Sequence, residues 1–291
     1  MQHWVGLYER IWRTREAVFD DLLASETSLP RVIALYTRFE ACHQIFQTQE
    51  NGAWVIHVST AEADTGTALD KFERRGGIVA FGKTIEAPPH YRFDMAGMLN
   101  DFAADKDCVI ELGAGYGKRL FEMFLGGGAK DLRYIAAEPT AAGRRITAKL
   151  SRLVPDMSLD VAAFDFANPC FSPVHGFSRI LLFTSWSLMF VDALQDSFFA
   201  ELAKIPGEVT CVFVEPVGFQ INPSNDKISL DQRDTARERR WNLNFFQKLL
   251  DAQAAGLVEI EAISTDMFGP LDDTSSIASV CVVTKPALTP P

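Results

Sequence analysis

The most informative segment of this 291-residue chain is Val109-Ile110-Glu111-Leu112-Gly113-Ala114-Gly115-Tyr116-Gly117. Its first half is a short apolar run, typical of a buried strand, and three alternate glycines follow directly. Glycines at that position let the backbone turn sharply and approach a ligand closely. A helix that begins there points its free N–H groups at the ligand. The segment therefore predicts a strand, a ligand-binding turn and a helix in succession.

The spacing of these glycines separates two classes of nucleotide-containing cofactor. A dinucleotide-binding turn requires the pattern G-x-G-x-x-G. Counted from Gly113, the last position of that pattern is Lys118, and the pattern also fails when counted from Gly115. The spacing is instead G-x-G-x-G, with Glu111 two positions before the first glycine. The sequence thus disfavours a dinucleotide.

Short apolar runs alternate with helical patterns through the rest of the chain. We expect strands at 108–112, 134–137, 159–164, 179–183 and 209–214, and one of the intervening helices at roughly 190–204. This alternation predicts a parallel sheet covered on both faces. The last two apolar runs, 257–263 and 277–283, leave no room for a helix between them, so they should pair antiparallel at the sheet edge.

The first hundred residues have a different pattern. Apolar side chains recur at three- and four-residue steps from Trp4 to Leu22 and again from Val32 to Phe46, which predicts two amphipathic helices. A short strand is expected at 55–58. We place a domain boundary near 95–105, between a mainly helical region 1–100 and a larger domain 101–291. The first region is expected to be a cap, a homodimer contact or a substrate-specificity element.

Composition excludes several classes of protein. With 47% hydrophobic and 23% charged residues the chain is globular, and a net charge of −10 disfavours nucleic acid as a partner. Apolar runs fall far short of the ~18–20 residues of a membrane helix, and early charges leave no room for a signal-peptide core. The five cysteines and five histidines are scattered without metal-ligand spacing, so we expect a cytoplasmic protein with reduced thiols and no metal.

The segment from Glu111 to Gly117 resembles motif I of the class I S-adenosylmethionine-dependent methyltransferases, and the resemblance covers roughly residues 105–285. It implies a Rossmann-like, doubly wound α/β sheet in the order 3-2-1-4-5-7-6 with strand 7 antiparallel. It also implies S-adenosyl-L-methionine as cofactor. The expected activity is methyl transfer to a small-molecule acceptor, at the oxygen of a sugar or another metabolite.

Carboxylates stand at the C-terminal ends of three successive expected strands, where open parallel sheets bind ligands. The resemblance implies that Glu111 holds the methionine end of the cofactor and Glu138 the ribose, while Asp165 and Phe166 contact the adenine. Each acid could instead be an N-cap or a loop carboxylate. The full set of expected cofactor-binding residues is Glu111, Gly113, Ala114, Gly115, Gly117, Glu138, Asp165, Phe166 and Thr184.

The acceptor should lie beyond the ends of the fourth and fifth strands. Trp186 and Glu215 stand there and are the candidates for substrate contact and for any catalytic role, although a core-edge tryptophan and a loop carboxylate are equally good readings. Tyr91, with His90, could fold over the cofactor as a lid. His175 precedes the fourth strand, at the wrong end of the sheet for a base.

Other features leave alternatives open. Residues 168–171 resemble the Asn-Pro-Pro-aromatic motif of amino-group methyltransferases, but they follow the wrong strand and lack one proline, which favours a loop turn. The arginines of the insertion 219–242 indicate a solvated helix face or, alternatively, contacts with an anionic or polyhydroxyl substrate. Two further hypotheses are a protein or peptide methyltransferase, which needs a broad groove, and a non-catalytic cofactor-binding partner subunit.

Overall fold

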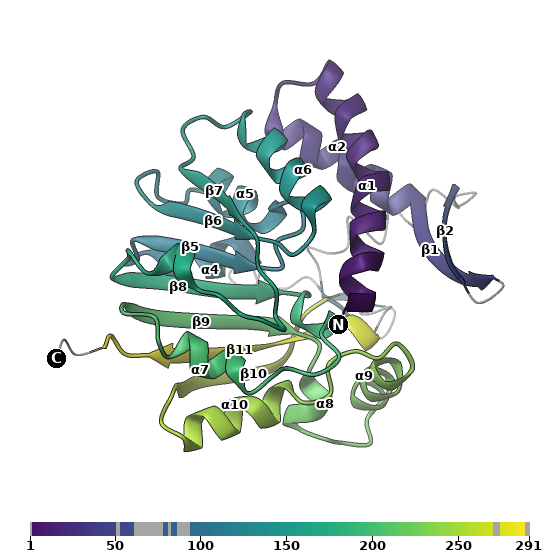
Figure 1. The fold of residues 1–291 in the computed structure, drawn as a ribbon. Coiled ribbons are helices and arrows are strands. Elements are labelled where there is room, and N and C mark those ends of the chain that lie inside the picture. The colour runs from purple at the N-terminus through teal and green to yellow at the C-terminus, as the bar shows by residue number, and fades with distance from the viewer. Residues whose placement is uncertain are drawn as a thin grey trace.

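The structure, a computed structural model, describes residues 2–50, 53–60, 78–80, 83–85, 94–269 and 274–288. Its centre is a seven-stranded sheet in the order β10-β11-β9-β8-β5-β6-β7 (Figure 1). Numbered along the chain, this is the expected order 3-2-1-4-5-7-6, and β11 runs antiparallel to both of its neighbours, so the expected fold class is confirmed. The strands are β5 (Cys108–Leu112), β6 (Arg133–Ala137), β7 (Leu159–Ala162), β8 (Arg179–Ser185), β9 (Glu208–Glu215), β10 (Glu259–Phe268) and β11 (Ala278–Lys285).

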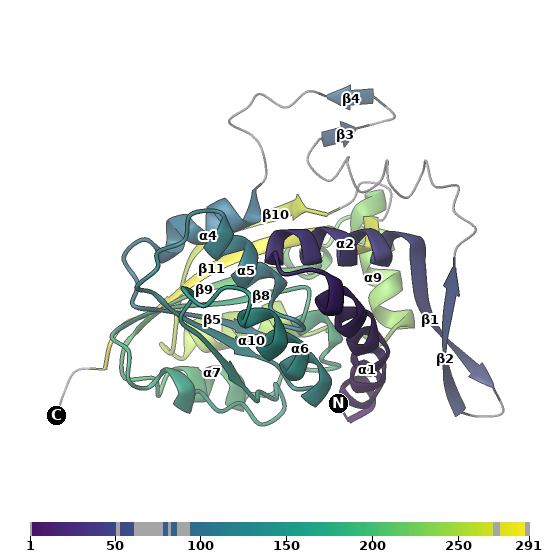
Figure 2. The same ribbon diagram turned by 90° about the horizontal axis from the view of Figure 1, so that it is seen from above.

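Helices cover both faces of this sheet (Figures 1 and 2). Successive side chains of a strand point to opposite faces, so Val109 packs in one apolar cluster and Ile110 in the other. The first cluster contains side chains of α1, α2 and α4–α6, and the second contains those of α7 and α10. The bounds are α1 (Gln2–Ser25), α2 (Leu29–Cys42), α4 (Met95–Ala103), α5 (Lys118–Leu125), α6 (Ala141–Ser151), α7 (Ser197–Leu202) and α10 (Phe245–Ala254).

The region before α4 contains strands as well as helices. The two expected helices are present as α1 and α2, but α2 ends at Cys42 rather than near Phe46. The antiparallel hairpin of β1 (His43–Glu50) and β2 (Ala53–Thr60) follows, and β3 (Ile78–Ala80) pairs with β4 (Lys83–Ile85). The sequence between β1 and β2 is Asn51-Gly52, the dipeptide most favoured in two-residue hairpin connections. Pairing with β2 therefore overrides the helical periodicity after residue 42.

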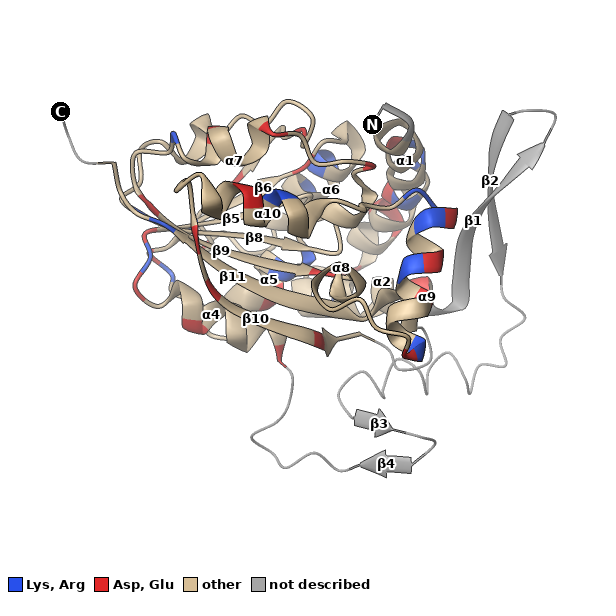
Figure 3. Ribbon diagram, turned by 90° about the horizontal axis from the view of Figure 1, so that it is seen from below, with Lys and Arg blue, Asp and Glu red and all other residues tan. Residues whose placement is uncertain are grey.

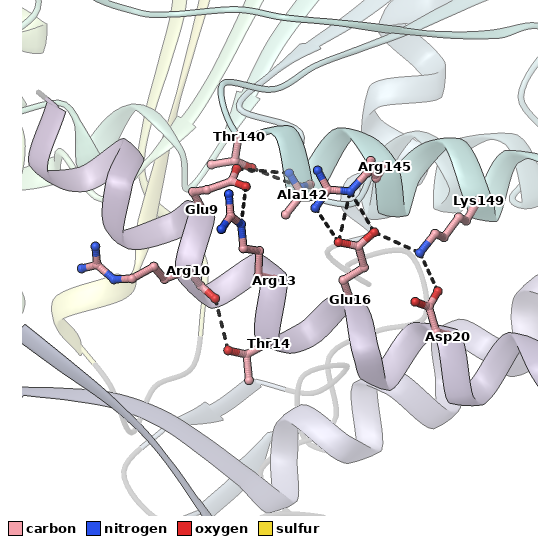
Figure 4. Close-up of polar contacts among 11 residues, drawn as sticks. Glu9, Arg10, Arg13, Thr14, Glu16, Asp20, Thr140, Ala142, Arg145 and Lys149 are labelled. Atoms are coloured by element: carbon pink, nitrogen blue, oxygen red, sulfur yellow. Dashed lines mark hydrogen bonds and ion pairs between the residues drawn. The ribbon is translucent and has the colours of Figure 1, made fainter.

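Helix α1 is bound to α6 by polar contacts along its length (Figure 4). Near its start, Glu9 Oε2 accepts a hydrogen bond from the backbone N–H of Ala142, at the first turn of α6. Farther along, the Glu16 carboxylate pairs with Arg145 at 2.6 Å and with Lys149 at 2.9 Å. Hydrogen bonding to Arg145 is the main cause that lowers the pKa of Glu16 to about 2. These contacts place α1 beside the second strand–helix unit of the sheet.

The expected helix at 190–204 is shorter than predicted. A single 3-10 turn spans Leu188–Phe190, and α7 begins only at Ser197. Between them the chain is held by Asn244, whose Oδ1 accepts from the N–H of Leu194 at 2.9 Å and whose Nδ2 donates to its carbonyl at 3.1 Å. Backbone groups that a helix would have satisfied internally are satisfied here by a distant side chain.

The insertion after β9 forms two helices, α8 (Gly218–Ile221) and α9 (Lys227–Glu238). Basic and acidic side chains alternate along α9 (Figure 3). In α9, Gln232 is buried and donates to Asp266 and to the Ile277 carbonyl, so α9 is fastened to the β10–β11 edge. Over the ranges that the structure describes, no helix is both long and apolar enough to cross a membrane.

Candidate cofactor site

The glycine turn after β5 needs glycine for two separate reasons. Gly113, Gly115 and Gly117 have φ values of 75°, 57° and 79°, in the left-handed region that side chains with a Cβ rarely adopt. A Cβ on Gly113 would also lie 2.5 Å from the Cβ of Ser187, and one on Gly115 would lie 2.8 Å from the ring of Trp12. The turn is therefore packed between the end of β8 and helix α1.

Glu138 ties this turn to the start of α6. One carboxylate oxygen accepts a hydrogen bond from the N–H of Gly115 at 2.9 Å, and the other accepts from the N–H and the hydroxyl of Thr140 at 3.0 Å and 2.5 Å. Burial raises the pKa of Glu138, and the bonds from Thr140 and Gly115 oppose that shift. The expected ribose-binding acid thus also connects the glycine turn to the second strand–helix unit.

Glu111 lies beneath the turn with one oxygen unsatisfied. The residue is 3% exposed, and its Oε2 has no hydrogen-bond partner among the residues that the structure describes. Burial raises the pKa of Glu111 well above its usual value, and the nearby cation of Arg119 opposes this shift. A buried carboxyl oxygen without a partner is costly, so this position suits a ligand that brings a donor or a positive charge.

Asp165 and Phe166 follow β7 as expected. Asp165 Oδ1 accepts from the N–H of Ala167 at 2.9 Å and Oδ2 accepts from Asn168 Nδ2 at 3.2 Å, so Asn168 is part of a turn. The ring of Phe166 is 5% exposed and packs edge-on against Phe164 at 5.1 Å between ring centroids. The carboxylate and the ring therefore stand side by side after the third strand.

These residues meet at one cavity of about 300 Å³. Of the residues expected at the site, those that line it are Glu111, Gly113, Ala114, Gly115, Glu138, Asp165, Phe166 and Trp186. Gly117, Thr184 and Glu215 are not among the lining residues. Tyr91 and His90, the expected lid, lie outside the described residues. The structure therefore brings the three carboxylates together and leaves three expected positions behind the cavity wall.

Trp186 forms part of the cavity wall, and its backbone is in a strained conformation. Its φ is 49°, unusual for a residue with a large side chain. The indole Nε1 donates to the carbonyl of Ser276 at 2.7 Å, and the Arg119 guanidinium lies 5.9 Å from the centre of the ring. These contacts on both sides hold the ring at the end of β8.

Glu215 lies behind this wall. It is fully buried, and its carboxylate accepts backbone N–H bonds from Ser187 at 3.1 Å, Leu188 at 3.0 Å and Met189 at 3.1 Å. Burial raises the pKa of Glu215 to about 7, against the opposing effect of these donors. Its position indicates a residue that fixes the loop after Trp186.

The sequence predicted a cap or specificity element within residues 1–100 but did not identify which residues of α1 line the cavity. Four cavity-lining residues, Trp4, Val5, Tyr8 and Trp12, come from one face of this helix. The apolar periodicity of that face identified a helix, but the same pattern is typical of ordinary packing. The other lining residues that were not predicted are Tyr116, Lys118, Arg119, Pro139, Ser185, Ser187, Phe190 and Val191.

His175 is exposed and precedes β8, at the opposite end of the strand from the cavity. Within the described ranges, no group of three His, Cys, Asp or Glu side chains could hold a metal ion.

No family model matches the chain, and no curated protein matches it in sequence. Solved structures similar to it include a geranyl diphosphate methyltransferase in complex with GPP and sinefungin, at 12% identity and a TM-score of 0.45, over 66% of this chain and 76% of that one. A second is geranyl diphosphate C-methyltransferase from Streptomyces coelicolor A3(2), at 14% identity and a TM-score of 0.46, over 66% of this chain and 78% of that one. A third is the N-terminal domain of EvdMO1 in the presence of SAH and D-fucose, at 13% identity and a TM-score of 0.42, over 78% of this chain and 98% of that one.

These identities and TM-scores are low, and the strand order itself establishes the fold. A seven-stranded sheet in the order 3-2-1-4-5-7-6, with only its last strand antiparallel, is the order that the motif I resemblance implied. The chain thus has the fold of the class I S-adenosylmethionine-dependent methyltransferases.

Proposed function

We propose that the chain is an S-adenosyl-L-methionine-dependent methyltransferase that methylates a small molecule at oxygen. The observation that carries this proposal is the meeting of Glu111, Glu138 and Asp165 with the glycine turn at one cavity. The three acids stand at the C-terminal ends of adjacent parallel strands, Glu111 within the last two residues of β5, Glu138 directly after β6 and Asp165 shortly after β7. Folds of this type bind ligands at that edge of the sheet.

The polar groups of the site fit this cofactor. The unsatisfied Oε2 of Glu111 suits the ammonium of the methionine end, Glu138 suits the ribose hydroxyls, and Asp165 beside Phe166 suits the adenine amine and ring. Lys118 and Arg119 also line the cavity. Both cations pair with Glu122, so the carboxylates Glu111, Glu138 and Asp165 leave the lining with an excess of negative groups when they are ionised, and this complements the net positive charge of the cofactor.

When bound, the cofactor supplies a methyl group on a positively charged sulfur; transfer breaks that S–C bond, leaves the electron pair on sulfur and forms the new bond to the acceptor oxygen. The chain contributes binding, alignment and exclusion of water. Helix α1 covers the cavity with Trp4, Tyr8 and Trp12, and Trp186 closes the side beyond β8. The acceptor's proton leaves to solvent or to a group of the acceptor itself.

Two alternatives receive less support. A protein or peptide methyltransferase would need a broad groove, whereas α1 narrows this cavity to about 300 Å³. A non-catalytic partner subunit would have Trp186 or the N-terminal region filling the acceptor space, whereas Trp186 is held to one side by Ser276 and Arg119. Cytoplasmic location, a possible homodimer and the assignment of 1–100 as a specificity region remain predictions.

Isothermal titration with S-adenosylhomocysteine tests the proposal. We expect binding in the micromolar range, and we expect Glu138→Gln to weaken it by at least tenfold, since hydrogen bonds to a charged group contribute about 1.5–3 kcal/mol each. Glu201→Gln, which changes a half-exposed glutamate on α7 outside the cavity, is the matched control and should bind like the unmodified chain. Absence of binding to folded protein at high micromolar concentration would overturn the proposal.

A further inference from the structure

Three aromatic rings make a corner of the cavity that the cofactor contacts proposed above do not use. Trp4 and Tyr8 come from α1, and Phe190 comes from the loop after β8. Ring centroids are 4.8 Å apart for Tyr8 and Phe190, 5.3 Å for Trp4 and Phe190, and 6.3 Å for Trp4 and Tyr8. The rings are tilted to one another, with interplanar angles of 35° to 56°. All three rings are only partly buried, so they present surface to the cavity.

The indole N–H groups and the Ser187 hydroxyl beside this ring corner are bonded to the protein. Trp4 Nε1 donates to Asp192 at 2.9 Å, and Trp186 Nε1 donates to a backbone carbonyl at 2.7 Å. The hydroxyl of Ser187 donates to the carbonyl at the end of β5, at 2.7 Å. The two indoles consequently present carbon surface, and not their N–H groups, to a ligand.

The ring corner is held in place from behind. Arg240 pairs with Asp192 at 2.8 Å, so one carboxylate holds both Trp4 and the end of the insertion. Trp241 packs edge-on against Phe190 with 6.1 Å between centroids. Because α1, the loop after β8 and the insertion all contribute, the corner is preorganised rather than assembled around the ligand.

We propose that the methyl acceptor is a planar, mainly apolar molecule with an aromatic or fused-ring system, which lies against Trp4, Tyr8 and Phe190. This inference rests on the proposed function, because it assigns the remaining part of the same cavity to the acceptor. A flat apolar ring gains contact area and ring–ring attraction there. A sugar would leave several hydroxyls facing carbon surface without partners, which costs free energy for each one.

The test uses two probes with the full chain saturated with S-adenosylhomocysteine. The planar probe is 2-naphthol and the polyhydroxyl probe is methyl α-D-glucopyranoside, each titrated by ligand-observed NMR. We expect saturable binding of 2-naphthol below 1 mM and no saturable binding of the glucoside at 10 mM. Phe190→Ser should weaken 2-naphthol binding by about tenfold. Phe177→Ser, the same change at a half-buried ring outside the cavity, should leave it within twofold.

A pair of changes at Tyr8 separates the ring from its hydroxyl. Tyr8→Ser should weaken 2-naphthol binding like the change at Phe190, and Tyr8→Phe, which keeps the ring, should restore it. Binding of the glucoside, or 2-naphthol binding that none of these changes alters, would overturn the inference. Retained S-adenosylhomocysteine affinity in each variant shows that it is folded. Loss of 2-naphthol binding alone leaves the proposed function standing, whereas absence of S-adenosylhomocysteine binding contradicts the proposed function.

Discussion

Replacement of the buried carboxyl behind the cavity wall gives a quantitative prediction. Glu215 is fully buried on β9, and burial raises the pKa of its carboxyl to about 7 from an ordinary 4.5. In the folded protein the carboxyl therefore keeps a proton that the unfolded chain releases above pH 4.5. The stability that follows from this difference is fully present below pH 4.5, falls as the pH rises, and stops falling above about pH 7.

The size of the effect follows from the width of that interval. One pKa unit corresponds to about 1.4 kcal/mol, so between pH 5.5 and pH 8.5 the contribution of Glu215 to the unfolding free energy should fall by about 2 kcal/mol. Starting at pH 5.5 keeps the protein away from its isoelectric point near 5.0. Glu215→Gln removes the titration, and its amide NH₂ must face at least one of three backbone N–H donors, at a cost of about 1–3 kcal/mol.

The assay is urea unfolding of both proteins at the two pH values, in the same buffer and salt. Other carboxyls with raised pKa values, including Glu111 and Glu138, are common to both proteins and cancel in the difference. We expect the unmodified chain to exceed the variant in stability by about 2 kcal/mol more at pH 5.5 than at pH 8.5. If the difference in unfolding free energy between the two proteins is the same at both pH values within about 0.5 kcal/mol, the inference that burial keeps Glu215 protonated is wrong.

Three further changes test how α1 and the glycine turn are packed. Gly113→Ala should destabilise the fold by about 2–4 kcal/mol in urea unfolding, because residue 113 has a left-handed backbone and the new Cβ would also clash with Ser187. Gly127 has a positive φ too, but a Cβ there meets no atom, so Gly127→Ala should cost only about 1 kcal/mol of backbone strain. Trp12→Ala should cost about 3–5 kcal/mol and weaken S-adenosylhomocysteine binding, and unchanged affinity would argue against a cofactor role for α1. Glu16→Gln should change stability by less than about 1 kcal/mol at 0.15 M salt, since its partners Arg145 and Lys149 are 48% and 30% exposed and solvent screens both ion pairs; a loss above 2 kcal/mol would mean a buried network.

Much of the fold could be predicted from local sequence. Apolar runs of four to six residues between helices specify a parallel sheet, and the absence of a helix between the last two runs specifies an antiparallel edge. The resemblance at Glu111–Gly117 then supplied the strand order. The predictions were wrong where distant groups replace local bonding. One such place is residues 191–196, an irregular segment in which Asn244 bonds both backbone groups of Leu194, and the other follows Cys42, where pairing with β2 ends α2.

By itself the sequence determined the parallel sheet, the glycine turn and the carboxylates Glu111, Glu138 and Asp165, because each follows from spacing along one strand or turn. Only the tertiary structure decided what covers them. The docking of α1 on α6 and the ring corner depend on residues more than a hundred positions apart. Periodicity identifies an apolar helix face, but the partner of that face is set by three-dimensional packing, which no local pattern encodes.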